Sequence, residues 1–252
     1  MNRLLPFALL PFLALACRQN NTVQQEPSPA PPARFTQAAA PAAPDSTRPV
    51  RKATQAAPDT PARHGFSDVA ALDPGIRFDI RYATTNNFTK AKIYDCPRCL
   101  LRPEAAEALV GAHKALQKKN LGLKMFDCYR PRPYQQRLWD KVPNPDYVTP
   151  PAKGSMHSRG AAVDLTIVDA QDRELDMGTP YDFFGKEAHY DYTQLPAAVL
   201  ANRRLLRETM EAAGFKGIRT EWWHFSYGDK EWAAYYKKPF AIYSQIEFQI
   251  EP

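Results

Sequence analysis

The chain has 252 residues, of which 44% are hydrophobic, 12% aromatic and 24% charged, and its formal net charge is +6. Residues 1–62 hold six Lys or Arg against three Asp or Glu, which leaves 27 against 24 in the remainder. Because that remainder is close to neutral and has no basic cluster interleaved with aromatic residues, the composition excludes a nucleic-acid-binding domain.

The chain begins with one arginine and an apolar run, MNRLLPFALLPFLALAC, that stops at Cys17. The run is too short for a comfortable membrane span and is typical of a secretory signal. A cysteine directly after Leu-Ala-Leu-Ala resembles a bacterial lipoprotein signal, in which Cys17 becomes the lipidated first residue. Ala14 stands where such signals prefer leucine, so ordinary cleavage near Ala16 is the alternative. We expect an exported, periplasmic protein whose contact with a membrane is a lipid at Cys17.

A tract without a core-forming pattern follows. Residues 20–62 contain nine prolines and eleven alanines but one aromatic residue, Phe35. Such a segment cannot bury enough apolar surface to offset the loss of chain entropy on folding, and it is typical of an extended tether. We therefore assign residues 1–17 to a signal, 18–64 to a tether and 65–252 to one folded domain of ordinary size.

The folded part mixes helical and strand patterns. Three helices are predicted, at residues 103–119, 133–140 and 196–213. Three strands are predicted, at residues 121–129, 161–168 and 217–227. Pro103 and Pro133 suit the first turns of their helices, and Gly214 suits a helix end. Since helices and strands do not alternate strictly, the pattern favours an α+β domain built on a largely antiparallel sheet with flanking helices.

Three residues have the types and surroundings of metal ligands. Asp164 lies in an apolar run, where a bare carboxylate would cost several kcal/mol unless a cation or several donors met it. His157 precedes it by seven residues, and His224 stands in the motif EWWHF. Two imidazoles and one carboxylate are a common ligand set for catalytic zinc. Taken singly, each has a plainer explanation. His157 can be a loop histidine, His224 a core histidine, and Asp164 a carboxylate that meets backbone N–H groups or Arg159.

Glu221 lies three residues before His224. A regular strand would place these two side chains on opposite faces of the sheet. If they act together, the chain needs a bulge or a strand end at Trp222–Trp223, and bulges are common beside active sites.

Two longer motifs give a family resemblance. The pattern S-x-H-x-x-G-x-A-x-D begins at Ser155, and E-x-W-H begins at Glu221. Together they resemble the D-alanyl-D-alanine metallopeptidases, which share their fold with the zinc domain of hedgehog proteins. NNFT at 86–89, YRP at 129–131 and ELDMGTPYDFF at 174–184 are similar to motifs of D-alanyl-D-alanine dipeptidases of the vancomycin-resistance type. The similarity runs from about residue 68 to about residue 225.

The resemblance implies an activity and a site. The activity is zinc-dependent hydrolysis of the D-alanyl-D-alanine dipeptide to two D-alanines. One zinc per chain would be held by His157, Asp164 and His224. The remaining implied roles are general base and acid for Glu221, transition-state stabilisation for Arg130, reception of the dipeptide's amino group for Asp182, and a place in the substrate pocket for Ser155.

Two alternatives stay open. A D,D- or L,D-carboxypeptidase that trims longer peptidoglycan peptides would share the zinc motif, but its cleft would be open and would not need Asp182. A non-catalytic wall-binding lipoprotein would have no use for Glu221 and Arg130, since binding alone requires no base beside a metal.

The cysteines depart from the resemblance. With Cys17 lipidated, the domain keeps Cys96 and Cys99 in the stretch CPRC, together with Cys128, an odd number in an oxidising compartment. We expect one disulfide that joins Cys128 to Cys96 or to Cys99.

Overall fold

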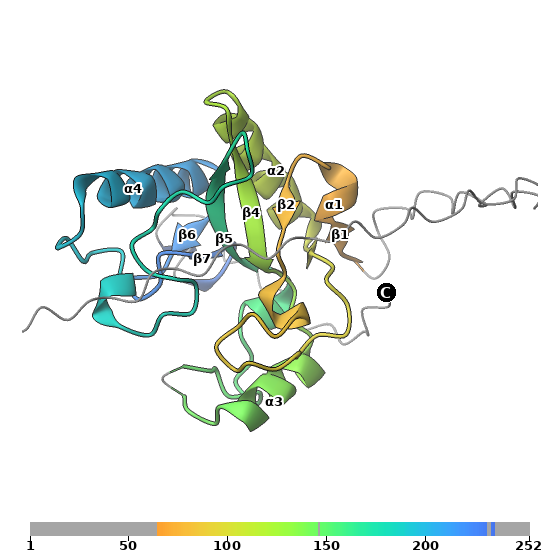
Figure 1. The fold of residues 1–252 in the computed structure, drawn as a ribbon. Helices are drawn as coiled ribbons and strands as arrows, with labels where there is room; N and C mark the ends of the chain where they lie inside the picture. Colours follow the sequence, from red (N-terminus) through yellow and green to blue (C-terminus); the bar gives the residue numbers. More distant parts are fainter. Residues whose placement is uncertain (1–64, 146, 231–232, 235–252) are drawn as a thin grey trace, which may run out of the picture. The chain divides into compact units, whose positions relative to one another are not determined.

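The computed structural model describes residues 65–145, 147–230 and 233–234 (Figure 1). The predicted signal with Cys17 and the predicted tether at residues 18–64 lie outside the described residues. Within the described part of the chain, no helix is long and apolar enough to cross a membrane.

A five-stranded sheet forms the centre of the domain. Its strands lie in the order β2 (Arg77–Phe78), β4 (Leu121–Asp127), β5 (Ala162–Asp169), β7 (His224–Ser226) and β6 (Lys216–Gly217). The pair β2–β4 is parallel and the other three pairs are antiparallel. A two-stranded antiparallel sheet pairs β1 (Ser67–Asp68) with β3 (Leu100–Leu101). The predicted α+β fold with a largely antiparallel sheet is therefore confirmed.

Two long helices lie together against one side of the central sheet (Figure 1). Helix α2 (Pro103–Gln117) starts at the predicted proline, and α4 (Ala197–Ala212) ends just before Gly214, whose φ of 91° is the left-handed conformation expected after a helix. Alternate residues of β5, namely Val163, Leu165 and Ile167, belong to the same buried core as the apolar residues of α2. This face of the sheet is thus filled by the core, and polar chemistry belongs to the other face.

Shorter helices shape the other regions of the domain. Helix α1 (Val69–Leu72) precedes β2, and α3 (Arg132–Lys141) lies beyond the end of β4 (Figure 1). The described residues also include the single-turn helices η2 (Arg81–Ala83), η3 (His157–Arg159) and η4 (Lys186–Ala188).

The predicted strand at residues 217–227 is wrong in its extent. The chain forms β6 and β7 there, antiparallel to each other, and the segment between Gly217 and His224 is irregular. Both tryptophans of EWWHF are buried in this segment, and the carbonyl oxygen of Trp223 accepts a hydrogen bond from Leu165 N of β5 at 3.2 Å. The strand end that Glu221 and His224 require is therefore present at the predicted place.

A bulge distorts β4 at its end. Met125 pairs with Leu165, and the next paired residue is Asp127, opposite Asp164, so Phe126 is the extra residue. A bulge lets two consecutive side chains oppose a single residue of the partner strand. As a result, Asp127 joins Asp164 at the same level of the sheet.

Candidate active site

Three acidic or imidazole side chains form a row across the central sheet. Asp127 of β4 pairs with Asp164 of β5, and Asp164 pairs with His224 of β7. Directly opposed residues of antiparallel strands point to the same face, with their Cβ atoms close together. The register thus explains why His224, 60 residues after Asp164 in the chain, has its Nδ1 2.9 Å from Asp164 Oδ1.

His157 reaches this row from the turn before β5. It opens η3, and Gly160 ends that turn with φ of 67°, in a place where a Cβ would lie 2.0 Å from the ring of Phe66. Gly160 therefore meets two requirements of this position, a left-handed backbone and the absence of a side chain. His157 is buried, its Nδ1 lies 2.9 Å from the carbonyl oxygen of Cys128, and its Nε2 lies 3.2 Å from His224 Nδ1.

The three side chains suit a metal ion. The ligand atoms of His157, Asp164 and His224 all lie within 4.8 Å of one another. A ring N–H at Nδ1 of His157 donates to Cys128 O, which leaves the Nε2 lone pair directed at the other two groups. Burial alone would raise the pKa of Asp164, but the two imidazoles outweigh it and hold that pKa below its usual range. Two imidazole nitrogens and one carboxylate oxygen that converge in this way fit a catalytic zinc.

Glu221 lies at the edge of this cluster. Its Oε2 is 4.0 Å from His224 Nδ1, and its side chain is 31% exposed, so the carboxylate has access to solvent. Burial among the neighbouring groups raises the pKa of Glu221, although His224 opposes the shift. A carboxylate with a raised pKa beside a metal site is suited to take and return a proton.

Arg130 is held by a network of buried groups. Its Nε and Nη2 donate to Asp127 Oδ2 at 3.1 and 2.5 Å, and its Nη1 donates to Gln135 Oε1 at 3.1 Å. Tyr94 OH accepts from Nε at 3.0 Å and donates to Asp127 Oδ1 at 2.7 Å. Burial by itself would lower the pKa of Arg130, but Asp127 raises it well above its usual value, so the guanidinium stays charged.

Asp182 lies close to the row on a separate loop. It adopts φ of 59°, and its Oδ2 accepts a hydrogen bond from Tyr82 OH at 3.0 Å. Burial, with the charge of Asp164, raises the pKa of Asp182 well above its usual value. The guanidinium of Arg130 lies over the ring of Tyr82, 5.0 Å from its centroid. Tyr82 therefore contacts both the partly buried carboxyl group of Asp182 and the buried cation of Arg130.

Two further predicted residues belong to the framework of the site. Ser155 Oγ accepts from Ser158 N at 3.3 Å, so it braces the turn that carries His157. In the NNFT stretch, Asn87 is buried, and its Nδ2 donates to the carbonyl oxygens of Arg81, Thr84 and Ala91. That amide fixes the loop immediately after Tyr82.

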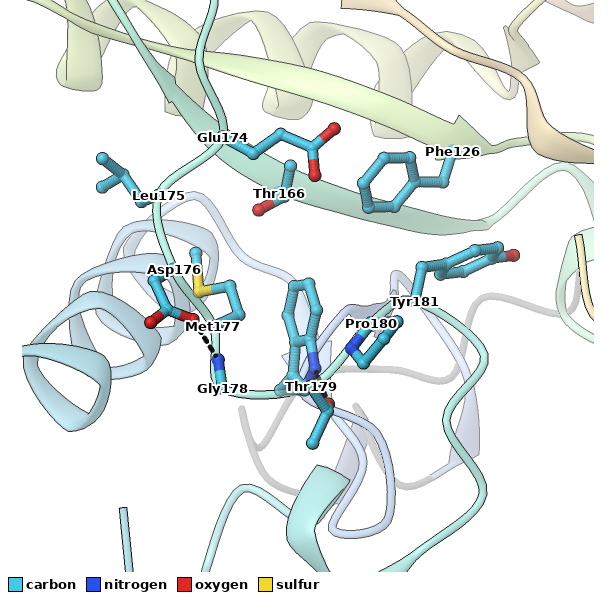
Figure 2. Close-up of a pocket in the computed structure, with 11 residues that line it drawn as sticks. Phe126, Thr166, Glu174, Leu175, Asp176, Met177, Gly178, Thr179, Pro180 and Tyr181 are labelled. Carbon is cyan, nitrogen blue, oxygen red and sulfur yellow. Dashed lines mark hydrogen bonds between the residues drawn. The ribbon is translucent and has the colours of Figure 1, made fainter. Parts of the chain in front are cut away.

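A pocket of about 380 Å³ adjoins the row (Figure 2). Phe126, Thr166 and Tyr181 line it together with the segment 174–180 and Trp222. Thr166 follows Asp164 by two residues on β5, so both lie on the same face of the sheet. Tyr181 OH donates to Asp164 Oδ2 at 3.0 Å, which places this ring between the pocket and the three candidate ligands.

Sequence reasoning missed Asp127, Tyr82, Tyr94, Gln135 and Tyr181. Three of them stand close to or within a motif that it did single out: Tyr82 four residues before NNFT, Asp127 three residues before Arg130, and Tyr181 inside ELDMGTPYDFF. Their roles depend on contacts between distant segments, so the motifs alone carried no signal for them.

The predicted disulfide is present. It joins Cys99 to Cys128, and Cys96 lies buried nearby with Phe66, Leu100 and Tyr129. The sequence left Cys96 and Cys99 open as partners of Cys128, and in the structure the partner is Cys99.

The site geometry is that of a metallopeptidase: a buried ligand triad, a carboxylate beside it and a fixed arginine. The sequence model of a peptidase family described as D-ala-D-ala dipeptidase matches residues 62–245. The chain is 40% identical over 158 residues to the D-alanyl-D-alanine dipeptidase of Escherichia coli (strain K12), with 63% of this chain and 82% of the relative covered. It is 32% identical over 187 residues to that of Enterococcus faecium, with 66% and 93% covered.

One similar solved structure is that of a vancomycin-resistance D,D-pentapeptidase, VanY, in complex with Zn(II). It is 17% identical to this chain, with a TM-score of 0.35 and with 56% of this chain and 80% of that chain covered. Because the family match spans most of the chain, this protein belongs to the D-ala-D-ala dipeptidase family of peptidases. The predicted class, a zinc metallopeptidase, is confirmed.

Proposed function

We propose that this protein hydrolyses the D-alanyl-D-alanine dipeptide to two D-alanines, with one zinc per chain held by His157, Asp164 and His224. The observation that carries the proposal is the convergence of these ligand atoms within 4.8 Å, with Glu221 at their edge. Zinc held by these residues would polarise the peptide carbonyl as a Lewis acid and would make water a nucleophile at neutral pH.

The protein groups divide the remaining work. Glu221 takes a proton from the attacking water and later passes it to the leaving amine. Arg130 pairs with the negative charge that develops on the carbonyl oxygen. Its guanidinium has five N–H groups, and its contacts to Asp127, Tyr94 and Gln135 occupy one on each nitrogen. The two that are left can meet an oxyanion without disturbing the network.

Asp182 supports the dipeptide as the substrate. A dipeptide has a free ammonium close to the bond that is cut, and a carboxylate there would receive it by charge-assisted hydrogen bonds. Burial and Asp164 disfavour the charged form of Asp182, and a substrate ammonium would restore it. An N-acylated or longer peptide brings no such charge and gains nothing from this residue.

Aromatic rings near Asp182 favour the same choice. Phe184, two residues after Asp182, packs at 5.0 Å against Phe88 and at 4.6 Å against Tyr147. Phe88 in turn contacts Tyr82, which is bonded to Asp182. These rings bring segments from three loops together beside Asp182, and we expect them to restrict the space for an extended peptide.

The cellular setting belongs to the same proposal and rests on sequence alone. The apolar start that ends at Cys17 supports export, and the Pro/Ala-rich residues 18–64 support a tether between a lipid and the peptidase domain. In that setting the enzyme would act on dipeptides in the periplasm, close to the membrane.

The test uses purified full chain. We expect about one zinc per chain, rapid cleavage of D-alanyl-D-alanine, loss of activity with a chelator and recovery with zinc. N-acetyl-D-alanyl-D-alanine and a pentapeptide that ends in D-alanyl-D-alanine should be cut poorly. If terminal D-alanine leaves the pentapeptide as fast as the dipeptide is split, the carboxypeptidase alternative is correct. A protein that binds zinc but cuts none of the three would be the wall-binding alternative.

A further inference from the structure

The segment 128–130 leaves the sheet where β4 ends, yet it carries contacts on which the site depends. Cys128 O accepts from His157 Nδ1 at 2.9 Å, and Arg130 N donates to His157 O at 3.1 Å. Two hydrogen bonds thus join residues 128–130 to His157, one to its ring and one to its backbone carbonyl oxygen. Arg130 itself comes from this segment, so its position and the orientation of the His157 ring depend on the same three residues.

No ladder of the central sheet holds this segment, because β4 stops at Asp127. The Arg130 side chain and the Cys128 N–H bond to Asp127, and two other ties of the segment run to the neighbourhood of β3. Tyr129 N donates to Leu100 O at 3.1 Å, and the disulfide joins Cys128 to Cys99, the residue before β3. Cys99 is itself anchored, since its carbonyl oxygen accepts from Val69 N at 3.0 Å. The disulfide is therefore the covalent link between a fixed part of the fold and the residue whose carbonyl orients His157.

We propose that the Cys99–Cys128 disulfide is a positioning element of the active site: it fixes the Cys128 carbonyl that orients His157 for zinc, and it anchors the backbone that carries Arg130. This inference rests on the proposed roles of His157 and Arg130. Groups that orient a metal ligand through its second ring nitrogen typically change metal affinity or activity by about 10- to 100-fold when they are lost. A disulfide that acts only on the unfolded chain would change stability and leave both properties alone.

The test compares two variants of the full chain. Cys99→Ala/Cys128→Ala removes the disulfide but keeps the Cys128 backbone carbonyl, and replacing both cysteines prevents a new pairing with Cys96. Cys96→Ala is the matched control, because it removes a buried sulfur nearby and leaves the disulfide in place. Zinc affinity is measured on metal-free protein by competition with a chelating dye, and kcat and KM are measured after zinc is restored.

We expect the double variant to bind zinc about tenfold more weakly or worse, and to lose turnover more than substrate affinity. Cys96→Ala should stay within about twofold of the wild type in both. A double variant that melts at a lower temperature but keeps wild-type zinc affinity and kcat would overturn the proposal, since the disulfide would then serve stability alone. Failure of the wild type to bind zinc or cut the dipeptide would instead contradict the proposed function.

If the double variant does not fold, the wild type supplies the answer. The zinc-loaded protein is reduced with a phosphine well below its melting temperature, while disulfide content and zinc release are followed together. Zinc release that tracks loss of the disulfide supports the positioning role. Full retention of zinc by folded, reduced protein overturns it.

Discussion

Replacement of Arg130 by lysine tests how closely the arginine is tied to the transition state. Lysine keeps the charge but has one nitrogen, whereas Arg130 distributes its contacts among Asp127, Tyr94 and Gln135 through three nitrogens. A lysine that reaches Asp127 cannot also present a planar pair of donors to the carbonyl oxygen. Loss of one oxyanion contact is worth about 3 to 4 kcal/mol, or roughly 100- to 1,000-fold in kcat.

The same substitution also disturbs the fold, and this effect is separable. Asp127 is fully buried, and the two Arg130 donors that meet its Oδ2 would be replaced by a single donor, which should lower the free energy of unfolding by about 1 to 3 kcal/mol. Arg137→Lys is the matched control: Arg137 also pairs with an aspartate, Asp95, but both side chains are about half exposed. That pair should contribute about 1 kcal/mol at most and nothing to turnover.

The assay is steady-state cleavage of D-alanyl-D-alanine by zinc-loaded Arg130→Lys, with thermal unfolding measured on the same preparation. We expect a large fall in kcat with KM changed little. A variant with normal kcat and a raised KM would move Arg130 from catalysis to substrate binding. Normal values of both would show that the arginine does not contact the reacting carbonyl.

Three further predictions follow from other contacts. Glu221→Ala should keep zinc and lose turnover, whereas His157→Ala should lose zinc, both seen by metal analysis beside the rate assay; near-normal turnover in Glu221→Ala would refute the assigned base. Asp182→Asn should lower kcat/KM for the dipeptide and leave cleavage of N-acetyl-D-alanyl-D-alanine unchanged, so an equal fall for both substrates would contradict its role with the ammonium. Burial lowers the pKa of His113, whose Nδ1 accepts from Leu123 N, so the folded state resists protonation and stability should fall as pH drops below about 6.5. The free energy of unfolding in urea is measured at pH 7.5 and at pH 5.5 for the wild type and for His113→Gln. The variant should lose less of this free energy between the two pH values. An equal loss in both proteins would show that other groups cause it.

The local sequence determined the elements and the identity of the chemical groups. The helix of residues 103–117 and the strand of residues 162–169 follow from patterns a few residues long, because capping residues and apolar periodicity act over one or two turns. The motifs that contain His157, Asp164, Glu221 and His224 were sufficient to predict a zinc site and the need for a strand end before His224.

Only the tertiary structure decided how these groups meet. The register between strands places Asp127, Asp164 and His224 in one row, and the bulge at Phe126 brings Asp127 into it. Register is a property of two distant segments, and a shift by one residue would turn each side chain to the other face. The same holds for the pairing of Cys128 with Cys99 and of Tyr82 with Asp182, which depend on where loops far apart in the chain come to rest. Sequence named the chemical groups; packing of the whole domain set the distances between them.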